Sequence, residues 1–139
     1  MILLDTNVLS AVMQAEPPDV VIAWLNRQPT RAVWTTAVTV FEVEYGLQRI
    51  PEGRRRKKLE KAFHATIAEE LGGRILSLDA QAALAAGGVA AAMEAEGRTP
   101  DFRDALIAGI TRARGAVLAT RNVKHFEGVC QLVNPWEDT

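Results

Sequence analysis

The sequence has few of the features that mark secreted, thiolate-metal or membrane proteins. Its 139 residues include one cysteine, Cys130, so an intramolecular disulfide and a cysteine-rich zinc site are excluded. No stretch approaches the roughly 18 uninterrupted apolar residues of a membrane span. The apolar run before Asp5 is also too short for a signal peptide. We therefore expect a cytoplasmic protein that does not associate with a membrane.

The chain also lacks an excess of charge of either sign. Its net charge is −1, which gives no overall attraction to nucleic acid or to an anionic membrane surface. An anionic partner would have to be held by a local basic patch or by a metal ion. With 48% hydrophobic and 24% charged residues, the composition is that of an ordinary globular protein. The length favours one domain, residues 1–139, that buries about two-thirds of its unfolded surface.

Short apolar runs alternate with segments of helical periodicity along the whole chain. Strands are expected at residues 2–4, 31–36, 74–78, 116–120 and 131–133. Helices are expected at residues 8–15, 19–25, 40–49, 54–71, 79–96, 101–114 and 123–127, with Asp19 and Asp79 as caps. This alternation predicts an α/β fold, in which helices cover both faces of a parallel sheet.

Polar side chains follow the first and fourth expected strands. Asp5-Thr6-Asn7 comes after one, and Thr120-Arg121-Asn122 comes after the other. The carboxyl ends of parallel strands share one edge of the sheet, where ligands usually bind, and two of the expected helices begin there. The side chains expected to meet at this edge are Asp5, Glu42, Asp104 and Asn122. Oxygen ligands of this kind suit Mg²⁺ or Mn²⁺.

Each of these four residues also has a structural interpretation. Asp5 is a good N-cap for the helix that follows it. Glu42 could be a solvated helix residue, and Asn122 could occupy a turn. Asp104 lies three residues after Asp101, which is the spacing of a capping pair. What favours a site is that all four are expected at the same edge of the sheet.

Five segments, in this order, resemble the motifs of the PIN-domain ribonucleases. They are LLDTN at residues 3–7, FEVEYG at 41–46, DFRDALIA at 101–108, ATRNVKHF at 119–126 and VNPW at 133–136. More narrowly, the chain is similar to the VapC-type toxins of bacterial toxin–antitoxin pairs, including the FitB-like branch. The resemblance extends over nearly the whole chain. It implies a three-layer α/β/α sandwich around a mainly parallel five-stranded sheet.

The resemblance further implies a Mg²⁺- or Mn²⁺-dependent endoribonuclease that acts as the toxin of such a pair. It implies a homodimer, inhibited when a cognate VapB-like antitoxin inserts a C-terminal segment into the active site. Carried over by motif, the metal-binding and catalytic residues are Asp5, Glu42 and Asp104. Asn122 takes the fourth catalytic position, where many relatives have Asp, so one charge that could hold a second metal is missing. Thr6 and Thr120 would orient the ligands.

Basic residues beside Asn122 are candidates for contacts with RNA phosphates. They are Arg121, Lys124 and His125, and ordinary surface charge is the alternative. The basic run at residues 54–58 spreads around more than one helical turn and is interpreted as a solvated face. Apolar residues at 8–12 and 45–50 exceed what one core needs and are candidates for a dimer interface.

Parts of the sequence also resemble the sites of three other kinds of protein. A phosphotransfer receiver could use Asp79, but no lysine stands just after a late strand to complete that site. A haloacid-dehalogenase-type phosphatase needs a second Asp where this chain has Asn7. A catalytically weak PIN-like module that binds RNA or an antitoxin without cutting remains an alternative, because Asn122 replaces an acid.

Overall fold

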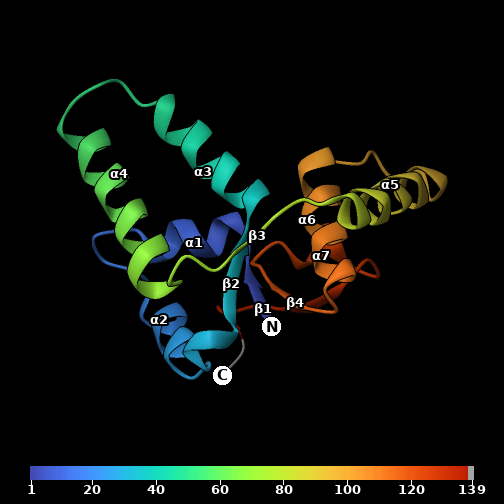
Figure 1. The fold of residues 1–139 in the computed structure, drawn as a ribbon, viewed down its shortest axis with the longest axis horizontal. Helices are drawn as coiled ribbons and strands as arrows, with labels where there is room; N and C mark the ends of the chain where they lie inside the picture. The colour runs from blue at the N-terminus through green and yellow to red at the C-terminus, as the bar shows by residue number, and fades with distance from the viewer. Residues whose placement is uncertain (138–139) are drawn as a thin grey trace.

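A five-stranded parallel sheet forms the centre of the protein, whose computed structural model describes residues 1–137 (Figure 1). The strand order is β3-β2-β1-β4-β5, and every neighbouring pair is parallel. The strands are β1 (Ile2–Leu4), β2 (Val33–Thr36), β3 (Ile75–Leu76), β4 (Val117–Ala119) and β5 (Gln131–Val133). The predicted sheet is thus confirmed, with β5 at one edge, and it is parallel throughout the described residues.

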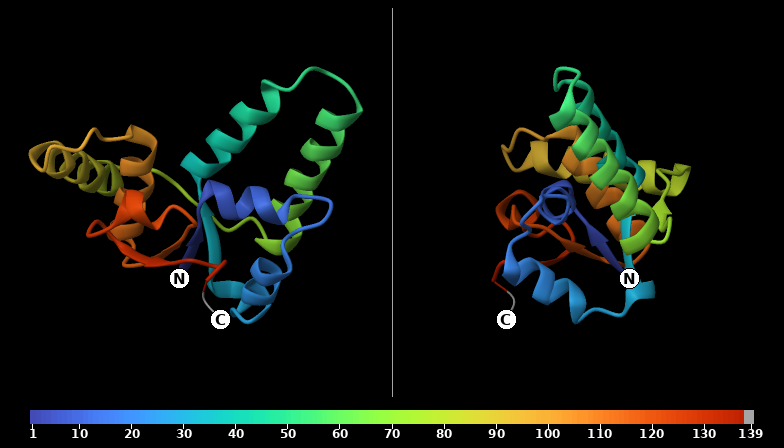
Figure 2. Two further views of the ribbon diagram at one scale, coloured as in Figure 1. Left: turned by 180° about the vertical axis from the view of Figure 1, so that it is seen from behind. Right: turned by 90° about the vertical axis from the view of Figure 1, so that its left-hand side faces the viewer.

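Helices cover both faces of this sheet, as Figures 1 and 2 show. They are α1 (Thr6–Val12), α2 (Asp19–Asn26), α3 (Ala37–Gln48), α4 (Arg54–Ala65), α5 (Ala80–Ala95), α6 (Phe102–Ala113) and α7 (Val123–Phe126). A 3₁₀ turn, η1 (Thr30–Ala32), precedes β2, and a π-helical turn, η2 (Thr66–Glu70), continues α4. No helix within residues 1–137 has the length and apolar character needed to cross a membrane.

Successive residues of the central strands point into two separate cores. Leu3 and Leu118 pack with α5 and α6 on one face of the sheet. Leu4 and Ala119 pack with α1 to α4 on the other face. All four side chains are buried, as expected for a parallel strand whose side chains alternate between two covered faces. The predicted three-layer α/β/α sandwich is therefore confirmed.

Several element boundaries differ from the prediction. Helix α1 begins at Thr6, not at residue 8, because the Asp5 carboxylate accepts a hydrogen bond from the Thr6 N–H and caps the helix there. The N-cap of α2 is Pro18, and Asp19 instead occupies the first turn, where the helix dipole favours a carboxylate. Strand β2 begins only at Val33 because the 3₁₀ turn takes up the preceding residues.

The helix predicted for residues 40–49 begins earlier, and the one predicted for 54–71 is divided. Helix α3 starts at Ala37, since the Thr36 hydroxyl accepts from the Thr39 N–H and ends β2 directly in a helix cap. The second helix passes into the π-helical turn η2, whose end is marked by the Leu71 N–H donating to the Thr66 carbonyl. The early start of α3 places its first turns at the carboxyl edge of the sheet.

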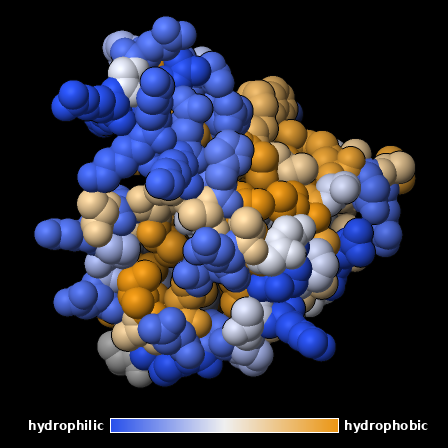
Figure 3. Space-filling view, turned by 60° about the vertical axis from the view of Figure 1, so that its left-hand side comes forward, coloured by the Kyte–Doolittle hydropathy of each residue, from blue (hydrophilic) through white to orange (hydrophobic). Residues whose placement is uncertain are grey.

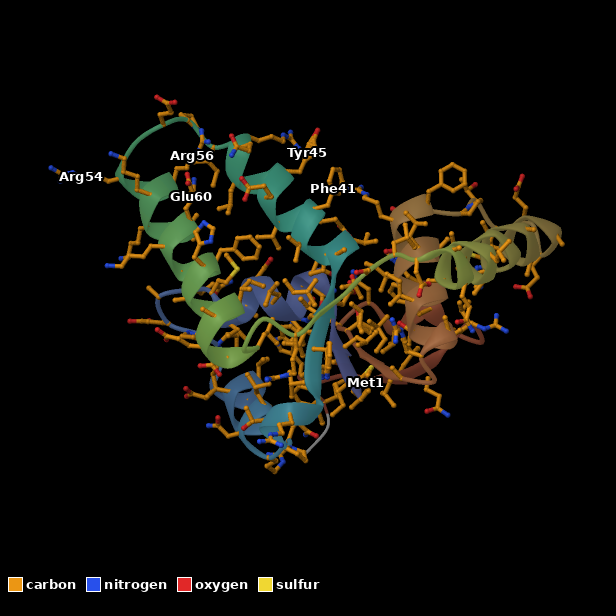
Figure 4. The ribbon with its side chains drawn as sticks, viewed as in Figure 1. Met1, Phe41, Tyr45, Arg54, Arg56 and Glu60 are labelled. Atoms are coloured by element: carbon orange, nitrogen blue, oxygen red, sulfur yellow. The ribbon has the colours of Figure 1, made fainter. Side chains whose placement is uncertain are left out.

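The tip of the α3–α4 hairpin carries the basic run of residues 54–58. In the space-filling view of Figure 3, this tip is covered by hydrophilic side chains. Arg54 projects outward, whereas Arg56 lies between the two helices (Figure 4). There Arg56 donates to Glu60 at 2.8 Å and to Gln48 at 2.6 Å. The other four residues of the run are exposed, as the solvated-face interpretation predicts, whereas Arg56 departs from it because its side chain is held within the hairpin.

The exposed apolar surface agrees only in part with the one the sequence predicted for a dimer. Val8 and Leu9 of α1 are fully buried in the core, because α1 packs against both α2 and α3. Large apolar side chains are exposed on three helices, and one of them, Tyr45, lies in the predicted segment 45–50. They are Phe41 and Tyr45 on α3, Leu84 on α5 and Phe102 on α6. Figure 4 shows Phe41 and Tyr45 projecting from the same helix, with their rings in an edge-to-face contact.

Candidate functional site

The site lies where the carboxyl ends of β1, β2 and β4 meet. β1 lies between β2 and β4, and the Asp5 N–H donates to the Ala119 carbonyl at 2.9 Å. Asp5 and Thr120 are therefore the first residues beyond two adjacent parallel strands. The parallel topology thus brings Asp5 and Thr120 together, although they are more than 100 positions apart in the sequence. Helices α1 and α3 begin at this same edge.

Asp5 is the most tightly held carboxylate of the site, with 4% of its surface exposed. Its Oδ1 accepts from the Thr6 N–H at 2.8 Å. Its Oδ2 accepts from the Thr120 hydroxyl at 2.7 Å and from the Asn7 side-chain amide at 3.3 Å. Asp5 thus caps α1, as the structural interpretation held, while its second oxygen belongs to a buried polar network.

Burial raises the pKa of the Asp5 carboxyl above its ordinary value. The hydrogen bonds from Thr120, the Thr6 N–H and Asn7 lower the pKa of Asp5 but do not cancel the rise. The charge of His125 also lowers this pKa. No Lys or Arg within residues 1–137 forms an ion pair with Asp5. A buried carboxylate held only by neutral donors is an electrostatic cost that a bound cation would remove.

Glu42 reaches the site from the second turn of α3, with 19% of its side chain exposed. Burial raises the pKa of its carboxyl, and the charges of Asp5 and Asp104 raise it further. The Thr6 hydroxyl and the Arg103 guanidinium act against this rise. Arg103 Nη1 lies 3.9 Å from Glu42 Oε2, a loose ion pair on a half-exposed arginine. Glu42 therefore faces the other two carboxylates, although its position alone allowed a solvated role.

Asp104 enters from the first turn of α6, with 22% of its side chain exposed. The Asp101 carboxylate accepts from the Asp104 N–H at 3.3 Å, so the capping pair foreseen from the sequence is present. Burial raises the pKa of Asp104, and the charges of Asp101 and Asp5 add to the rise. His125 Nδ1, at 3.4 Å from Asp104 Oδ2, opposes it. Capping by Asp101 thus positions Asp104 and leaves its carboxylate directed at the site.

The three carboxylates suit a hard divalent cation in their chemistry. They offer oxygen ligands only, and the charge of Asp5 raises the pKa of both other groups. Beside them, Thr6 Oγ1 is buried and has no well-formed hydrogen bond within residues 1–137, although the hydroxyl is near enough to stabilise charged Glu42. In the same part of the chain, no three His, Cys, Asp or Glu side chains stand close enough to hold an ion without adjustment.

Thr120 connects the acidic residues to the segment that follows β4. Its fully buried hydroxyl donates to Asp5 and accepts from the Asn7 amide at 3.2 Å and from the Asn122 N–H at 3.0 Å. Asn122 itself is exposed, and the contact is made by its backbone. The structure therefore brings Asn122 to the site through its N–H, and a catalytic role for its side chain stays a prediction.

The three basic residues proposed for RNA all lie on the exposed segment around α7. The Arg121 guanidinium stacks over the ring of Trp136, 4.8 Å from its centre. His125 contacts Asp104, and Lys124 lines a cleft next to it. Their contacts with RNA remain predictions, but all three belong to the segment that contacts Asn7 and Asp104.

Two residues of the site were missed from the sequence. Asn7 donates to Asp5 and Thr120, and its side-chain carbonyl accepts from the Arg121 N–H at 3.0 Å. Its place in the same strand-end motif as Asp5 was the available signal. Arg103 lies 3.9 Å from both Glu42 and Asp101. Its position between two aspartates of one helix start was a weaker signal, because nothing in the sequence indicates contact with α3.

Comparisons with known proteins agree with this fold. The family model described as PIN domain matches residues 2–131. VapC ribonuclease Y4jK of Sinorhizobium fredii is 34% identical over 138 residues, which are 99% of each chain. Toxin FitB of Neisseria gonorrhoeae is 30% identical over 139 residues, 99% of this chain and 100% of that protein. The crystal structure of FitAcB from Neisseria gonorrhoeae superposes with a TM-score of 0.87 at 29% identity, over 99% of this chain and 100% of that one. The resemblance expected from the sequence is confirmed: the chain belongs to the PIN-domain family and, within it, to the group of VapC ribonucleases and FitB-like toxins.

Proposed function

We propose that this protein is a divalent-metal-dependent endoribonuclease and the toxin of a toxin–antitoxin pair. The observation that carries the proposal is the convergence of Asp5, Glu42 and Asp104 from three different elements on one sheet edge. Relatives that match nearly the whole chain are named a VapC ribonuclease and a toxin, which supports the same activity and role.

The proposed reaction is hydrolysis of an RNA phosphodiester bond. Asp5, Glu42 and Asp104 would hold Mg²⁺ or Mn²⁺, which when bound polarises a phosphate and lowers the pKa of a coordinated water. Thr120, Asn7 and the Thr6 N–H fix the direction of the Asp5 carboxylate, which supports its role as the central ligand.

The basic residues around α7 would guide the RNA toward this acidic site. The net charge of −1 supplies no general attraction, so local cations must offset the repulsion between RNA and the carboxylates. Arg121, Lys124 and His125 lie on the side of the site that follows β4. Such a substrate is met in the cytoplasm, where we expect the protein to act.

We also propose a homodimer and a cognate VapB-like antitoxin as the protein's partners. The exposed apolar side chains of α3, α5 and α6 offer surfaces for such contacts. Phe41 and Tyr45 in particular stand at the surface 58% and 45% exposed, which is uncommon for large aromatic side chains without a partner. The carboxylate site, which needs a cation or donor to be neutralised, would receive the inhibitory segment of the antitoxin.

The decisive experiment compares two glutamates of one helix. Glu42→Gln should reduce RNA cleavage in Mg²⁺ by about 100-fold or more, the scale of losing one electrostatic contact in an active site. Glu44→Gln is the matched control, because Glu44 accepts from Gln48 of the same helix and is not among the groups that act on the three carboxylates. Equal cleavage by both variants, or cleavage by the wild type that persists in EDTA, would contradict the proposal.

The alternative is a catalytically weak module that binds RNA or an antitoxin. The observation that favours it is Asn122, whose exposed side chain adds no charge to the site. Asn122→Asp separates the two functions. A wild type that cleaves RNA rules out the binding module, whereas RNA binding without cleavage, with activity gained by Asn122→Asp, would support it.

A further inference from the structure

A cleft of about 280 Å³ opens beside Asp104, and its lining includes no residue of α3. It lies between the loop that joins α5 to α6 and the start of α7. Its charged lining comes from Arg98, Lys124, His125, Asp101 and Asp104. Met93 and Thr99 complete it. This cleft shares Asp104 with the carboxylate site, and the two are therefore adjacent.

The cations of the cleft are presented in different ways. Arg98 is fixed, since its Nη2 donates to the His125 carbonyl at 3.1 Å and its Nη1 lies 3.6 Å from Glu96. About a third of its side chain remains exposed. Lys124 is exposed and has no ion-pair partner among the described residues. The cleft thus holds one positioned guanidinium and one free ammonium group.

The polarity of the cleft matches one kind of ligand. Asp104 belongs to the proposed cation site, and the basic Arg98 and Lys124 line the same cleft. A chain of phosphates crosses such a surface with one phosphate at the cation and a neighbouring phosphate at the basic groups. Arginine and lysine bind phosphate oxygens by charge-assisted hydrogen bonds. The volume lies near the lower limit for ligand sites, which suits one nucleotide and not several.

We propose that this cleft binds the nucleotide adjacent to the scissile phosphate, with its own phosphate held by Arg98 and Lys124. The sugar and base would lie against Met93 and Thr99, where a thioether contacts an aromatic face and a hydroxyl can bond a polar edge. The inference rests on the proposed ribonuclease function and deepens it, because it assigns a nucleotide subsite and two phosphate-binding residues to one side of the cut.

Arg98 has a competing structural role that the test must separate. Its bond to the His125 carbonyl joins the α5–α6 loop to α7, so Arg98→Gln could act by loosening that loop. Lys124 makes no such contact and is the residue for the primary test. Lys61, exposed on α4, provides the matched control because Lys61→Ala removes the same charge from another surface.

The test uses an RNA oligonucleotide whose cleavage position has been mapped with the wild-type protein. Versions are made in which one phosphate at a time is replaced by an uncharged methylphosphonate. Binding is measured by fluorescence anisotropy with Glu42→Gln protein, so that the RNA stays intact, alone and combined with Lys124→Ala, Arg98→Gln or Lys61→Ala. Thermal unfolding of each variant reports whether it is folded.

One phosphate next to the cleaved bond is expected to respond to Lys124. Lys124→Ala should weaken binding about tenfold, as for a lost charge-assisted hydrogen bond, and reduce the slope of log K against log salt by about 0.7. The methylphosphonate at that phosphate should then cause no further loss, while the other positions respond as before. Lys61→Ala should behave as the parent protein.

Two results would overturn the inference. One is that Lys124→Ala binds RNA as tightly as Lys61→Ala does. The other is that methylphosphonate substitution weakens binding to Lys124→Ala as much as binding to the parent protein at every phosphate. The ribonuclease proposal fails separately, if unmodified RNA is not cleaved by the wild type in Mg²⁺. In that case scanning all phosphates by binding alone still shows whether one of them depends on Lys124.

Discussion

At Gly109, α6 lies close against α5, and adding one methyl group there tests the packing that positions Asp104. A Cβ at residue 109 would lie 2.6 Å from the Ala82 carbonyl oxygen, 2.6 Å from the Ala86 Cβ and 2.6 Å from the Ala86 nitrogen. Two of these atoms belong to the backbone, so no side-chain rotation relieves the contact. Gly109→Ala therefore requires the two helices to move apart.

The expected loss of stability can be worked out from two opposing effects. Overpacking a tight contact costs up to about 3 kcal/mol, and the better helix propensity of Ala returns about 1 kcal/mol. The net destabilisation is therefore up to about 2 kcal/mol, or a fall in Tm of up to about 6 °C for a chain of this size. Gly87→Ala in α5 is the matched control, since its Cβ would meet nothing within 4 Å. That change should raise stability by up to about 1 kcal/mol.

Urea unfolding and RNA cleavage are measured for the wild type, Gly109→Ala and Gly87→Ala. Because Asp104 stands in the first turn of α6, a shift of that helix should lower the cleavage rate at least tenfold, given that misplacement by about 1 Å costs up to 100-fold. Adding Ala86→Gly relieves only one of the three contacts and should restore part of the stability. A Gly109→Ala protein as stable and as active as Gly87→Ala would refute the reasoning.

Three further predictions concern the site and the surface. The pKa of Glu42 is raised in the folded protein, so ionisation of this carboxyl opposes folding. In EDTA the free energy of unfolding of the wild type should therefore fall as pH rises from about 4.5 through the pKa of Glu42 in the folded protein. Urea unfolding at pH 4 and pH 7 should show a smaller fall for Glu42→Gln, and an equal fall would contradict this. Thr120→Val removes the buried hydroxyl that bonds to Asp5 and to the Asn122 N–H, and should lower the free energy of unfolding in urea by about 1–3 kcal/mol. Thr120→Ser should stay near the wild type, and equal stability of the two variants would argue against the network. Phe41→Asp changes a side chain that is 58% exposed and should shift sedimentation from dimer to monomer with little effect on Tm, and a monomeric wild type at micromolar concentration would oppose the dimer.

The sequence predicted the part of the site that parallel strand order determines. Asp5 and Thr120 follow apolar runs, and any parallel sheet that pairs those runs places the two residues side by side. Glu42 and Asp104 could be assigned because their helices begin at the same edge. The order of elements, combined with the family motifs, therefore determined the carboxylates.

Other features depend on packing that the order of elements does not specify. The side chain of Asn122 is exposed because the chain turns into α7 at that residue, and only its N–H reaches Thr120. The apolar residues of α1 serve the core, which left α3, α5 and α6 to supply the exposed apolar surface. Arg98 and Arg103 reach their partners across helices, a relation that no local spacing indicates. The single domain of residues 1–139 remains a prediction, supported by the family match over residues 2–131.

The central claim is that Asp5, Glu42 and Asp104 hold a divalent cation, and Mn²⁺ binding followed by electron paramagnetic resonance tests it most directly. The wild type should bind at least one Mn²⁺ per chain, and Mg²⁺ should displace it. Asp5→Asn should weaken that binding by at least tenfold, since changes even to residues that only support metal ligands cost about 10- to 100-fold. Asp79→Asn, which changes a carboxylate that caps α5 away from the site, should bind as the wild type does. Equal Mn²⁺ affinity in the Asp5→Asn and wild-type proteins, both folded, would contradict the account.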